Sequence, residues 1–409
     1  MSRISEQVER ARGARDKRAA LGDDLDLDSY TDRSRADITY REDPSTLPAE
    51  TKRQMLETGI TLDDLRQRAG TFVQVDNVVV HSSASQDGIE VLDIVTALEE
   101  HAWLEDYLWR AVSADTDKYT AKVAIEQSHG YFTRALPGSK ARSPVQSCLY
   151  LATERLAQNV HNVIIAEEGS ELHIITGCLV PRRTASGLHL GVTEFYVKKG
   201  ARLTFTMVHN WGSETAVRPR TAAIVEEGGT FLSHYICMRP VRTLQMYPSA
   251  TCAGKGAVAQ FNSVLVAGPG SSMDVGARVV LAAEGARAEV VSRALSTGGR
   301  IVARGHIVGQ VPEVKGHLEC RGLILSDNGE ILAIPELDGQ VAGVDLSHEA
   351  AIGKLAEEEL EYLMARGLSR DEATSAIIKG FISVDVAGLP PQLAEELQGA
   401  VALSDQEGL

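Results

Sequence analysis

The 409-residue sequence is 44% hydrophobic but only 5% aromatic, which indicates a substantial core built mainly from Val, Ile, Leu and Ala. A formal net charge of −15 argues against nucleic acid as a partner, and no apolar run reaches the ~18 to 20 residues that span a bilayer. The charged N-terminus does not resemble a signal peptide, so we expect a soluble, cytoplasmic protein without a membrane partner.

The first third of the chain is the most charged. Residues 1–70 contain helical stretches such as ISEQVERARGARDKRAAL, and we expect an exposed, partly flexible region there. Residues 71–120 are expected to lead into the core. Within them, FVQVDNVVVHSS alternates like a strand, and VLDIVTALEEHAWLEDYLWRAV has the apolar spacing of a helix.

The middle of the chain, residues 121–345, repeats a short pattern of polar or small residues, a glycine and a hydrophobic residue. The glycines of the series are Gly169, Gly200, Gly228, Gly256, Gly285, Gly316 and Gly343. Their sequence numbers differ in turn by 31, 28, 28, 29, 31 and 27. A period near 29 with glycine turns and β-branched runs predicts the rungs of a parallel β-helix. The alternatives are a β-sandwich with similar turn spacing and a chance series among 36 glycines.

The end of the chain, residues 346–409, returns to a helical pattern. Ser347 is a candidate N-cap, Gly367 ends the first helix, and Ser369 with Glu372 forms a capping box for the second. GLPPQ interrupts the second helix, and QLAEELQGAVAL suggests a third. One apolar face is expected to contain Ile352, Leu355, Leu360, Leu363 and Met364. Such a unit could cap the core, dock a partner, or do both.

Several familiar kinds of chemistry are absent from the sequence. There is no GxxxxGK[ST], GxSxG or HExxH, and no GxGxxG in a strand–turn–helix context, so we expect neither direct ATP binding nor an enzyme. The cysteines are odd in number and contain no CxxC, which excludes a disulfide framework and a zinc module. They are Cys148, Cys178, Cys237, Cys252 and Cys320.

One cluster of possible metal ligands stands out. Cys320 and Glu349 are separated by one period of the repeat, and His348 precedes Glu349. Residues one rung apart stack at ~4.8 Å, so the thiolate and the carboxylate could face one spot and bind iron. The alternative is structural, with a buried thiol, a packed imidazole and a carboxylate that favours a helix N-terminus.

The sequence from residue 346 to 381, LSHEAAIGKLAEEELEYLMARGLSRDEATSAIIKGF, strongly resembles the C-terminal signature of the SufB/SufD scaffold family, whose members assemble iron–sulfur clusters. Four further stretches match the family in the same order, and together they cover roughly residues 125–385. They are GYFTRALPGSKARSPVQS, VIIAEEGSELHIITGCLVPRRTASGLHLGVTEFYVKKGARLTFTMVHNW, YPSATCAGKGAVAQFNSVLVAGPGSSMDVGARVV and HLECRGLILSDNGEILAIPELDG.

The resemblance implies a right-handed parallel β-helix flanked by helical regions. It implies two partners: a SufC-type ABC ATPase, which would hydrolyse ATP, and a second scaffold subunit in a homodimer or heterodimer. It also implies a transient iron–sulfur cluster, expected to be [4Fe–4S]. The ATPase would dock on the C-terminal helices, through Ile352, Leu355, Leu360, Leu363, Met364 and Arg366.

Individual residues also match positions to which the family's members assign a role. Cys320 matches the cysteine proposed as a cluster ligand in SufB-type members, and Glu349 matches the glutamate of their HEA motif, with His348 before it. Cys178 matches a cysteine proposed to receive sulfur, and Trp211 matches the tryptophan of the family's QNW. These matches favour a SufB-like over a SufD-like member.

Three positions depart from the family pattern. His209 stands where QNW has glutamine, and Tyr150 and Ala152 stand where the family has arginine and asparagine. These departures put the family's sulfur path in doubt, so sulfur could arrive in another form, such as sulfide. Cys178 then has a structural alternative as a small residue packed inside the solenoid.

Two other functions remain as alternatives. A SufD-like subunit would steady the complex without a cluster of its own, and a β-helix enzyme could act on polysaccharide. The second would need a cleft with clustered carboxylates or basic groups, and we find no such set in the sequence. We interpret Cys148, Cys237 and Cys252 as structural.

Overall fold

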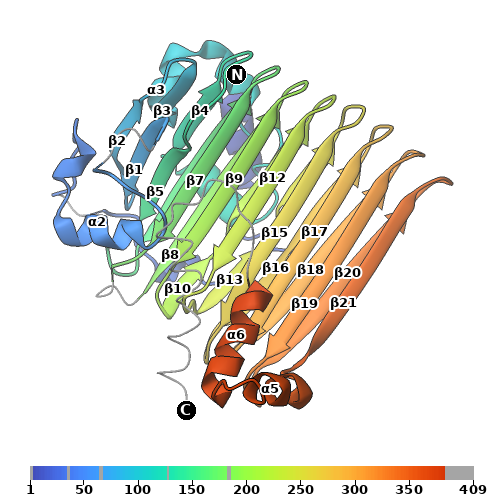
Figure 1. Cartoon of the computed structure of the whole chain (residues 1–409). Helices are drawn as coiled ribbons and strands as arrows, with labels where there is room; N and C mark the ends of the chain where they lie inside the picture. Colours follow the sequence, from blue (N-terminus) through green and yellow to red (C-terminus); the bar gives the residue numbers. More distant parts are fainter. Residues whose placement is uncertain (1–2, 35–36, 64–67, 127–128, 182–185, 383–409) are drawn as a thin grey trace.

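The computed structural model describes residues 3–34, 37–63, 68–126, 129–181 and 186–382. The chain is mainly β and forms a β-solenoid of about 8 turns with helices at both ends (Figure 1). The expected β-helix is therefore confirmed. No helix among these residues is long and apolar enough to cross a membrane.

Two sheets form opposite walls of the solenoid. The first sheet contains, in spatial order, β2 (Val78–Ala84), β1 (Gly70–Val75), β5 (Val145–Tyr150), β7 (Glu171–Leu179), β9 (Arg202–Asn210), β12 (Thr230–Cys237), β15 (Val258–Ala267), β17 (Arg287–Ser296), β19 (Lys315–Ile324) and β21 (Asp345–Lys354). The second contains β3 (Ile89–Asp93), β4 (Tyr131–Ala135), β6 (Ala157–Ala166), β8 (Ser186–Val197), β10 (Glu214–Val217), β11 (Arg220–Val225), β13 (Thr243–Met246), β14 (Ser249–Cys252), β16 (Ser272–Leu281), β18 (Arg300–Gly309) and β20 (Glu330–Gly339).

The pairing within each sheet excludes the β-sandwich alternative. From β5 to β21 every neighbouring pair of the first sheet is parallel, and each strand pairs with the one a rung later. Only the pairs β1–β2 and β3–β4, near the start of the solenoid, are antiparallel among the described pairs. Because parallel neighbours need a crossover, each chain passage must cross to the second sheet before it returns.

Six of the seven glycines in the repeat occupy left-handed turns before strands of the first sheet. Gly169, Gly200, Gly228, Gly256, Gly285 and Gly343 have φ between 63° and 82°. Gly316 does not, because it lies inside β19, where a Cβ would come within 2.7 Å of Ile307 and Leu346. The turn at that rung is made by Glu313, with φ of 60°. The last two turns, at positions 313 and 343, are therefore slightly further apart than the average period of the glycines.

The core fills the space between the two sheets. Alternate residues of each strand point inward, as in β19, where Leu318 and Cys320 are buried while Arg321 is exposed. One hydrophobic cluster runs the length of the solenoid, from Phe72 in β1 to Cys320 in β19.

The N-terminal region is docked on the body, in contrast to the exposed arm expected from its charge. It contains α1 (Arg3–Arg12), short helices η1 (Leu27–Ser29) and η2 (Pro44–Thr46), and α2 (Ala49–Leu56). Ala11 and Ala14 are buried in a cluster with Tyr119 of α4 (Lys118–Ile125). The buried guanidinium of Arg218 donates a hydrogen bond to the Asp23 carbonyl at 3.0 Å. Small apolar residues and backbone contacts thus attach the segment to the body, while most of its side chains stay exposed as its charge predicts.

The long helix expected over residues 91–112 is shorter and begins later. Val91 and Leu92 belong to β3, which pairs with β4. The side chain of Asp93 accepts from the backbone of Val95 and Thr96 and starts α3 (Ile94–Glu100), which is followed by η4 (Ala102–Asp106). Pairing with β4 therefore competes with the helical spacing of this stretch and prevails at its start.

A buried glutamate holds the loop that follows η4. Glu194 on β8 is fully buried, and its carboxylate accepts from the backbone N–H groups of Trp109 at 2.6 Å, Ala111 at 2.6 Å and Val112 at 3.1 Å. The ring of His161 lies 2.9 Å from the same carboxylate. This one side chain therefore joins the loop to the second sheet.

We expect Glu194→Ala to lower the free energy of unfolding by about 3–5 kcal/mol, because several buried groups lose their partner at once. Urea unfolding followed by circular dichroism measures this difference. The matched control is Glu226→Ala, which removes the ion pair of a half-exposed carboxylate with Lys198 and should change the free energy of unfolding by about 1 kcal/mol or less. Equal losses in the two variants would show that other contacts hold the loop.

The start of the C-terminal helical region differs from the prediction. Ser347 is not an N-cap; residues 345–354 form β21, because they complete a last rung against β19. Helices follow as α5 (Glu357–Met364) and α6 (Arg370–Ile382). Gly367 has φ of 100° after α5, and Ser369 exchanges hydrogen bonds with Glu372, as predicted. The GLPPQ segment and the third helix lie outside the described residues.

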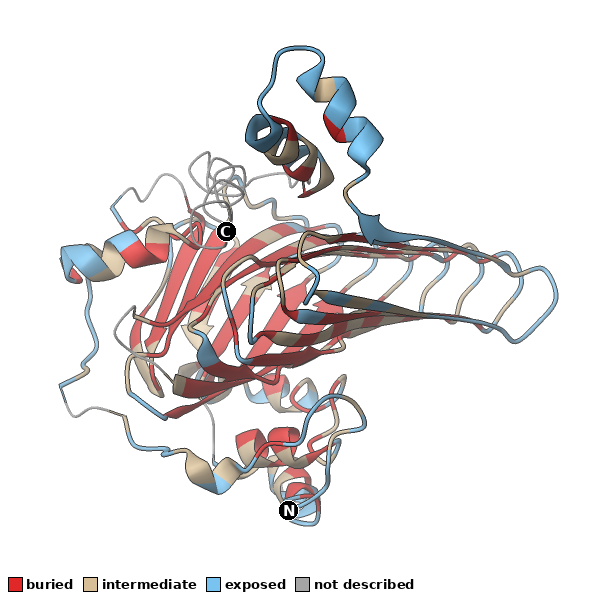
Figure 2. Ribbon diagram, turned by 90° about the horizontal axis from the view of Figure 1, so that it is seen from below, coloured by how far each residue is buried: buried red, intermediate tan, exposed pale blue. Residues whose placement is uncertain are grey.

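Helix α6 lies against the outer face of the first sheet, near the C-terminal ends of β15, β17 and β19 (Figures 1 and 2). Ile378 and Ile382 are buried there, in a cluster with Val264, Leu295 and Leu323. The helical pair is thus attached to the strands that form the last rungs of the solenoid.

Candidate functional site

Cys320 lies on the inner face of β19, one strand from the end of the first sheet. Only 2% of its surface is exposed, and its register neighbour on the preceding strand is Ser292. Burial, with a smaller contribution from Glu319, raises the pKa of the Cys320 thiol to about 11. The thiol is therefore protonated at neutral pH, and a metal that binds it must displace the proton.

Glu349 does not share the face of Cys320. The register pairs Cys320 with Ala350 and Glu319 with Glu349, so the predicted convergence of Cys320 and Glu349 is wrong. The physical reason is the length of the last rung, which is one residue longer than the period used for the prediction, as the pairing of Cys320 with Ala350 shows. A slip of one residue along a strand moves a side chain to the opposite face.

His348 does lie on the face of Cys320. The side chains of Leu346 and Ile352 lie against Gly316 and Gly322 on the inner side of β19. His348 is separated from each of them by an even number of residues, so its side chain lies on the same face of β21. His348 pairs with Leu318, which places it diagonally across from Cys320, about 8 Å away between Cα atoms on standard strand geometry. An imidazole and a thiolate are both suitable ligands for iron.

The ligand set of one chain is small. Within the described ranges, no group of three or more His, Cys, Asp and Glu side chains is placed to hold a metal ion. Cys320 and His348 provide two suitable groups at the end of the solenoid. A cluster that takes four protein ligands would need others from outside this chain.

The solenoid ends in open strand edges. Among the described strands, β21 pairs only with β19, and β20 pairs only with β18. Most of β21 is exposed, as Figure 2 shows. Apolar side chains are also exposed at this end, namely Leu332, Leu337, Val341 and Ile352, each between 38% and 44%. Unpaired edges of this kind are templates for another strand.

A second cluster lies inside the solenoid and joins the three predicted sulfur-transfer candidates. Cys178 on β7 is the register neighbour of His209 on β9. The rings of His209 and Trp211 have centroids 5.1 Å apart. All three residues are buried, with at most 3% of the surface exposed. The structure therefore places Cys178, His209 and Trp211 together, and their role in sulfur transfer stays a prediction.

Three further residues complete this internal cluster and were missed in the sequence. The hydroxyl of Tyr235 lies 2.7 Å from Nδ1 of His209, and Cys237 is the register neighbour of His209 on β12. His189 on β8 places its ring 5.1 Å from that of Trp211. The available signal was the period, because Cys237 follows His209 by the same interval that separates two pairs of the turn glycines.

Burial keeps the internal cluster uncharged. It lowers the pKa of His209 well below its usual range and the pKa of His189 to about 3. Burial also raises the pKa of the Cys178 thiol well above its ordinary value. Within the described part of the chain, Nε2 of His209 has no hydrogen-bond partner. The shifts of the two pKa values in opposite directions keep the proton on the thiol and the imidazole neutral.

The departures from the family pattern have structural roles here. The hydroxyl of Tyr150 donates to Gln54 of α2 at 2.7 Å. The backbone N–H of Ala152 donates to the Asp76 carboxylate at 2.6 Å. Tyr150 thus ties the end of β5 to α2, and Ala152 ties the following residues to the turn after β1. Cys148 is likewise buried beneath α2, in a cluster with Met55.

The predicted partner-binding residues do not share one helical face. Ile352 lies in β21, Leu355 packs against the α6 cluster, and Leu360 is 2% exposed. The exposed side of α5 presents Met364 and Tyr362, and Arg366 stacks over the Tyr362 ring at 4.6 Å. Leu363 is half-buried. The accessible residues of the predicted set are therefore Ile352 on β21 and, at the end of α5, Met364 and Arg366, where Tyr362 is also exposed.

Comparisons with known proteins find one matching family and several relatives. Residues 149–381 match the family described as SUF system FeS cluster assembly, SufBD core domain. An iron–sulfur cluster assembly SufBD family protein of Methanothermobacter thermautotrophicus is 45% identical over 406 residues, 98% of this chain and 99% of the relative. A SufBD family protein of Archaeoglobus fulgidus is 50% identical over 356 residues, 87% and 95% of the two chains. One of Staphylococcus aureus is 30% identical over 383 residues, 88% and 81%.

Proposed function

The chain belongs to the SufBD family of iron–sulfur cluster assembly proteins, and we propose that it is a SufB-like scaffold that builds a nascent cluster at the interface of two subunits. The observation that carries this proposal is the position of Cys320, which faces inward one strand from an open, exposed edge. Assembly would take place in the cytoplasm, where a reducing environment suits five free cysteines.

The incomplete ligand set supports a shared site. Cys320 would supply thiolate ligation, and His348 is the candidate second ligand because it lies on the same face. With two chains related by a two-fold axis, each pair occurs twice and gives four ligands. Glu349 lies on the opposite face beside Glu319, so it would reach the cluster only if the edge strand shifted by one residue.

The open edges support a second scaffold subunit as the partner. Among the described strands, β21 offers unpaired backbone groups on one side, and Ile352 is exposed on it. A second copy or a paralogous SufBD chain could add its own edge strand there. A homodimer and a heterodimer both satisfy this geometry, and the proposal covers either.

We further propose that the α5–α6 pair docks a SufC-type ABC ATPase, which would supply the ATP hydrolysis that this sequence lacks. Met364 and Tyr362 are exposed apolar side chains, and Arg366 beside them is of a type common in binding hot spots. Their position next to α6 connects the docking surface with the outer face of β19.

We expect Met364→Asp to weaken binding of the ATPase about tenfold or more, because a charge replaces a buried apolar contact. Titration calorimetry with the purified ATPase measures the Kd. Glu359→Gln is the matched control, since this exposed glutamate on α5 lies well around the helix from Met364. Unchanged binding in Met364→Asp would show that the ATPase docks elsewhere.

The internal cluster supports a role in handling sulfur. Cys178 would receive sulfur, and neutral His209 lies beside it on the next strand. Tyr235 fixes the orientation of His209 through its hydrogen bond. Since Tyr150 and Ala152 stand where the family has arginine and asparagine, entry of sulfur by the family's path has little support in this chain.

The proposal is tested by anaerobic reconstitution. The chain, alone and with its SufC-type ATPase, is supplied with ferrous iron and sulfide, and visible absorption and Mössbauer spectra are recorded. A [4Fe–4S] signature on the dimer is the expected result. If the wild-type complex binds no cluster, the protein is instead a SufD-like structural subunit, and Cys320 is an ordinary buried thiol.

A further inference from the structure

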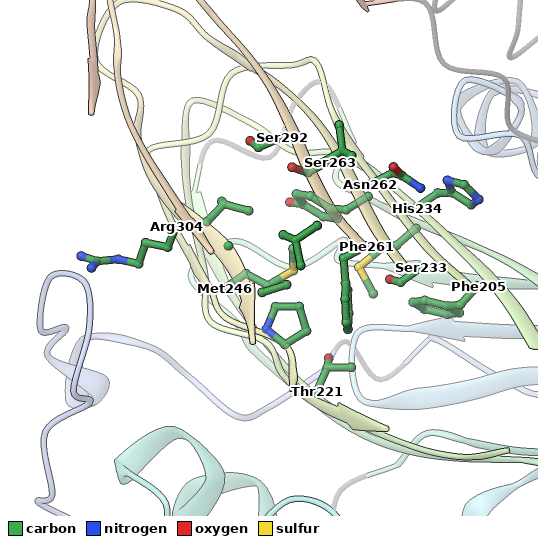
Figure 3. Close-up of a pocket in the computed structure, with 18 residues that line it drawn as sticks. Phe205, Thr221, Ser233, His234, Met246, Phe261, Asn262, Ser263, Ser292 and Arg304 are labelled. Atoms are coloured by element: carbon green, nitrogen blue, oxygen red, sulfur yellow. The ribbon is translucent and has the colours of Figure 1, made fainter. Parts of the chain in front are cut away.

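A cavity lies inside the solenoid between the two sheets, at the rungs formed by β12, β15, β17 and β16 (Figure 3). Its free volume is about 30 Å³, and a buried site needs roughly 10–15 Å³ to hold one water-sized molecule. The cavity can therefore hold about two such molecules. No residue of the predicted ligand set lines it.

The wall of the cavity is mostly apolar, with a polar row on one side. Phe205, Met246 and Phe261 supply carbon and sulfur atoms to it. The polar row consists of Tyr235, Ser263 and Ser292, and Ser233 and Thr221 add hydroxyl groups elsewhere on the wall. Ser292 is 4% exposed, and within the described chain its hydroxyl has no hydrogen-bond partner. A buried hydroxyl with unused hydrogen-bonding capacity beside free space is suited to hold a small polar ligand.

No charged side chain points into this space among the residues that line it. The side chains of Arg304 and His234 point away from the cavity in Figure 3. Arg304 is engaged outside the solenoid by Asp274, at 2.6 Å. A neutral molecule can therefore enter at little cost, whereas an unpaired anion would lose its hydration without compensation.

The polar row leads toward Cys320. Tyr235 pairs with Ser263, Ser263 with Ser292, and Ser292 with Cys320, each on the next rung. Successive rungs are ~4.8 Å apart. At the other end, Tyr235 is hydrogen-bonded to His209 of the internal cluster. The cavity thus lies between the internal cluster and the proposed cluster ligand.

We propose that this cavity binds neutral hydrogen sulfide, held by the hydroxyl of Ser292, one rung from Cys320. The inference rests on the proposed function, which requires a sulfur source. The ligand is small, uncharged and weakly polar, which suits a mostly apolar space with a buried, unpartnered hydroxyl at Ser292. Binding is non-covalent, and sulfide already has the oxidation state of cluster sulfur, so no reductant is needed at this step.

Xenon is the probe for the cavity, because dry apolar cavities bind it. Xenon NMR of the full-length chain should show a bound signal. Sulfide should displace the xenon in mildly acidic solution, where hydrogen sulfide predominates, and much less at the same total concentration in mildly alkaline solution, where hydrosulfide predominates. Absence of a bound xenon signal would refute the cavity as a binding site. Equal displacement of xenon at both pH values would refute the proposal that the bound species is neutral hydrogen sulfide.

Two variants test the location. Ala277→Leu should abolish the xenon signal without loss of stability, because Ala277 lines the cavity and the added carbons fill free space. Ala303→Leu is the matched control: Ala303 is an equally buried inward residue of the second sheet, but it does not line the cavity. This control should keep the xenon signal and should be destabilised by overpacking. If Ala303→Leu loses the xenon signal and Ala277→Leu keeps it, xenon binds at another place in the solenoid.

Ser292→Val tests the hydroxyl without filling the space. It should retain xenon, while displacement by sulfide should require several-fold more sulfide than in wild type. Cys320→Ala separates this inference from the proposed function, because it should form no cluster yet bind xenon and sulfide as wild type does. Loss of sulfide displacement in Cys320→Ala, with xenon retained, would place the sulfide at Cys320 and overturn the cavity assignment.

Discussion

Replacement of Cys320 by alanine should abolish formation of the iron–sulfur cluster while leaving the ATPase complex intact. Cys320 is the one cysteine on the described inner face of the last two strands of the first sheet, β19 and β21. Its loss removes the only thiolate there, and soft sulfur ligands are what iron–sulfur clusters require. Visible absorption and Mössbauer spectra after anaerobic reconstitution measure the cluster, and calorimetry measures ATPase binding.

The two neighbouring residues serve as graded comparisons. His348→Ala should lower the cluster yield or its lifetime, because His348 shares the face of Cys320. Glu349→Ala should have a smaller effect, because Glu349 points to the opposite face in this register. A larger effect of Glu349→Ala would show that β21 shifts by one residue when the cluster forms. A full cluster on Cys320→Ala would refute the scaffold site altogether.

The burial of Cys320 gives a reason for coupling to the ATPase. β19 presents Cys320 inward and Leu323 outward, and Leu323 packs against α6. We propose that movement of α6, driven by ATP binding to the docked ATPase, displaces β19 and rearranges the interface at Cys320. The two sites would then be coupled through one strand with a different contact on each face.

The fold was largely predictable because each turn of the repeat requires a particular local backbone conformation, which restricts the residue type at that position. Six glycines of the series occupy turns with positive φ, where a side chain would be strained. Gly316 is the exception for an equally local reason: Glu313 makes that turn, and Gly316 lies where the inner face is crowded. The exception matters because the glycine series gives an average period that is shorter than the last rung. The pairing of Cys320 with Ala350 shows the true length of that rung.

The sequence could indicate which residues of the candidate site are possible ligands, but not which face of the strand each of them occupies. The period places Cys320 and His348 on neighbouring rungs, but the face of Glu349 depends on a register that sequence spacing cannot provide. Ser347 has neighbours with helical spacing, yet pairing with β19 makes it part of a strand. Ser292 carries no sequence signal at all, since only the packing around it leaves its hydroxyl without a partner among the described residues.

Replacement of Ala350 by proline should dissociate the scaffold dimer while leaving the chain folded. The N–H of Asp345 donates to the carbonyl of Val314 at 3.0 Å, so residues of odd number in β21 direct their N–H groups toward β19. The N–H of Ala350 therefore faces the open edge. Proline there removes a donor that only a second subunit would use, and its ring obstructs a strand that approaches.

In a two-fold dimer the change occurs twice, so we expect a loss of about 2 kcal/mol or more, roughly a 30-fold increase in the dimer Kd. Sedimentation analysis measures the Kd, and urea unfolding confirms that the solenoid is intact. Ala350→Ser is the matched control, since it keeps the N–H and should dimerise normally. Cluster formation should fall with the dimer, because on the described inner face at this end one chain offers only Cys320 and His348. A monomeric Ala350→Pro chain that still assembles a full cluster would show that the ligands come from elsewhere.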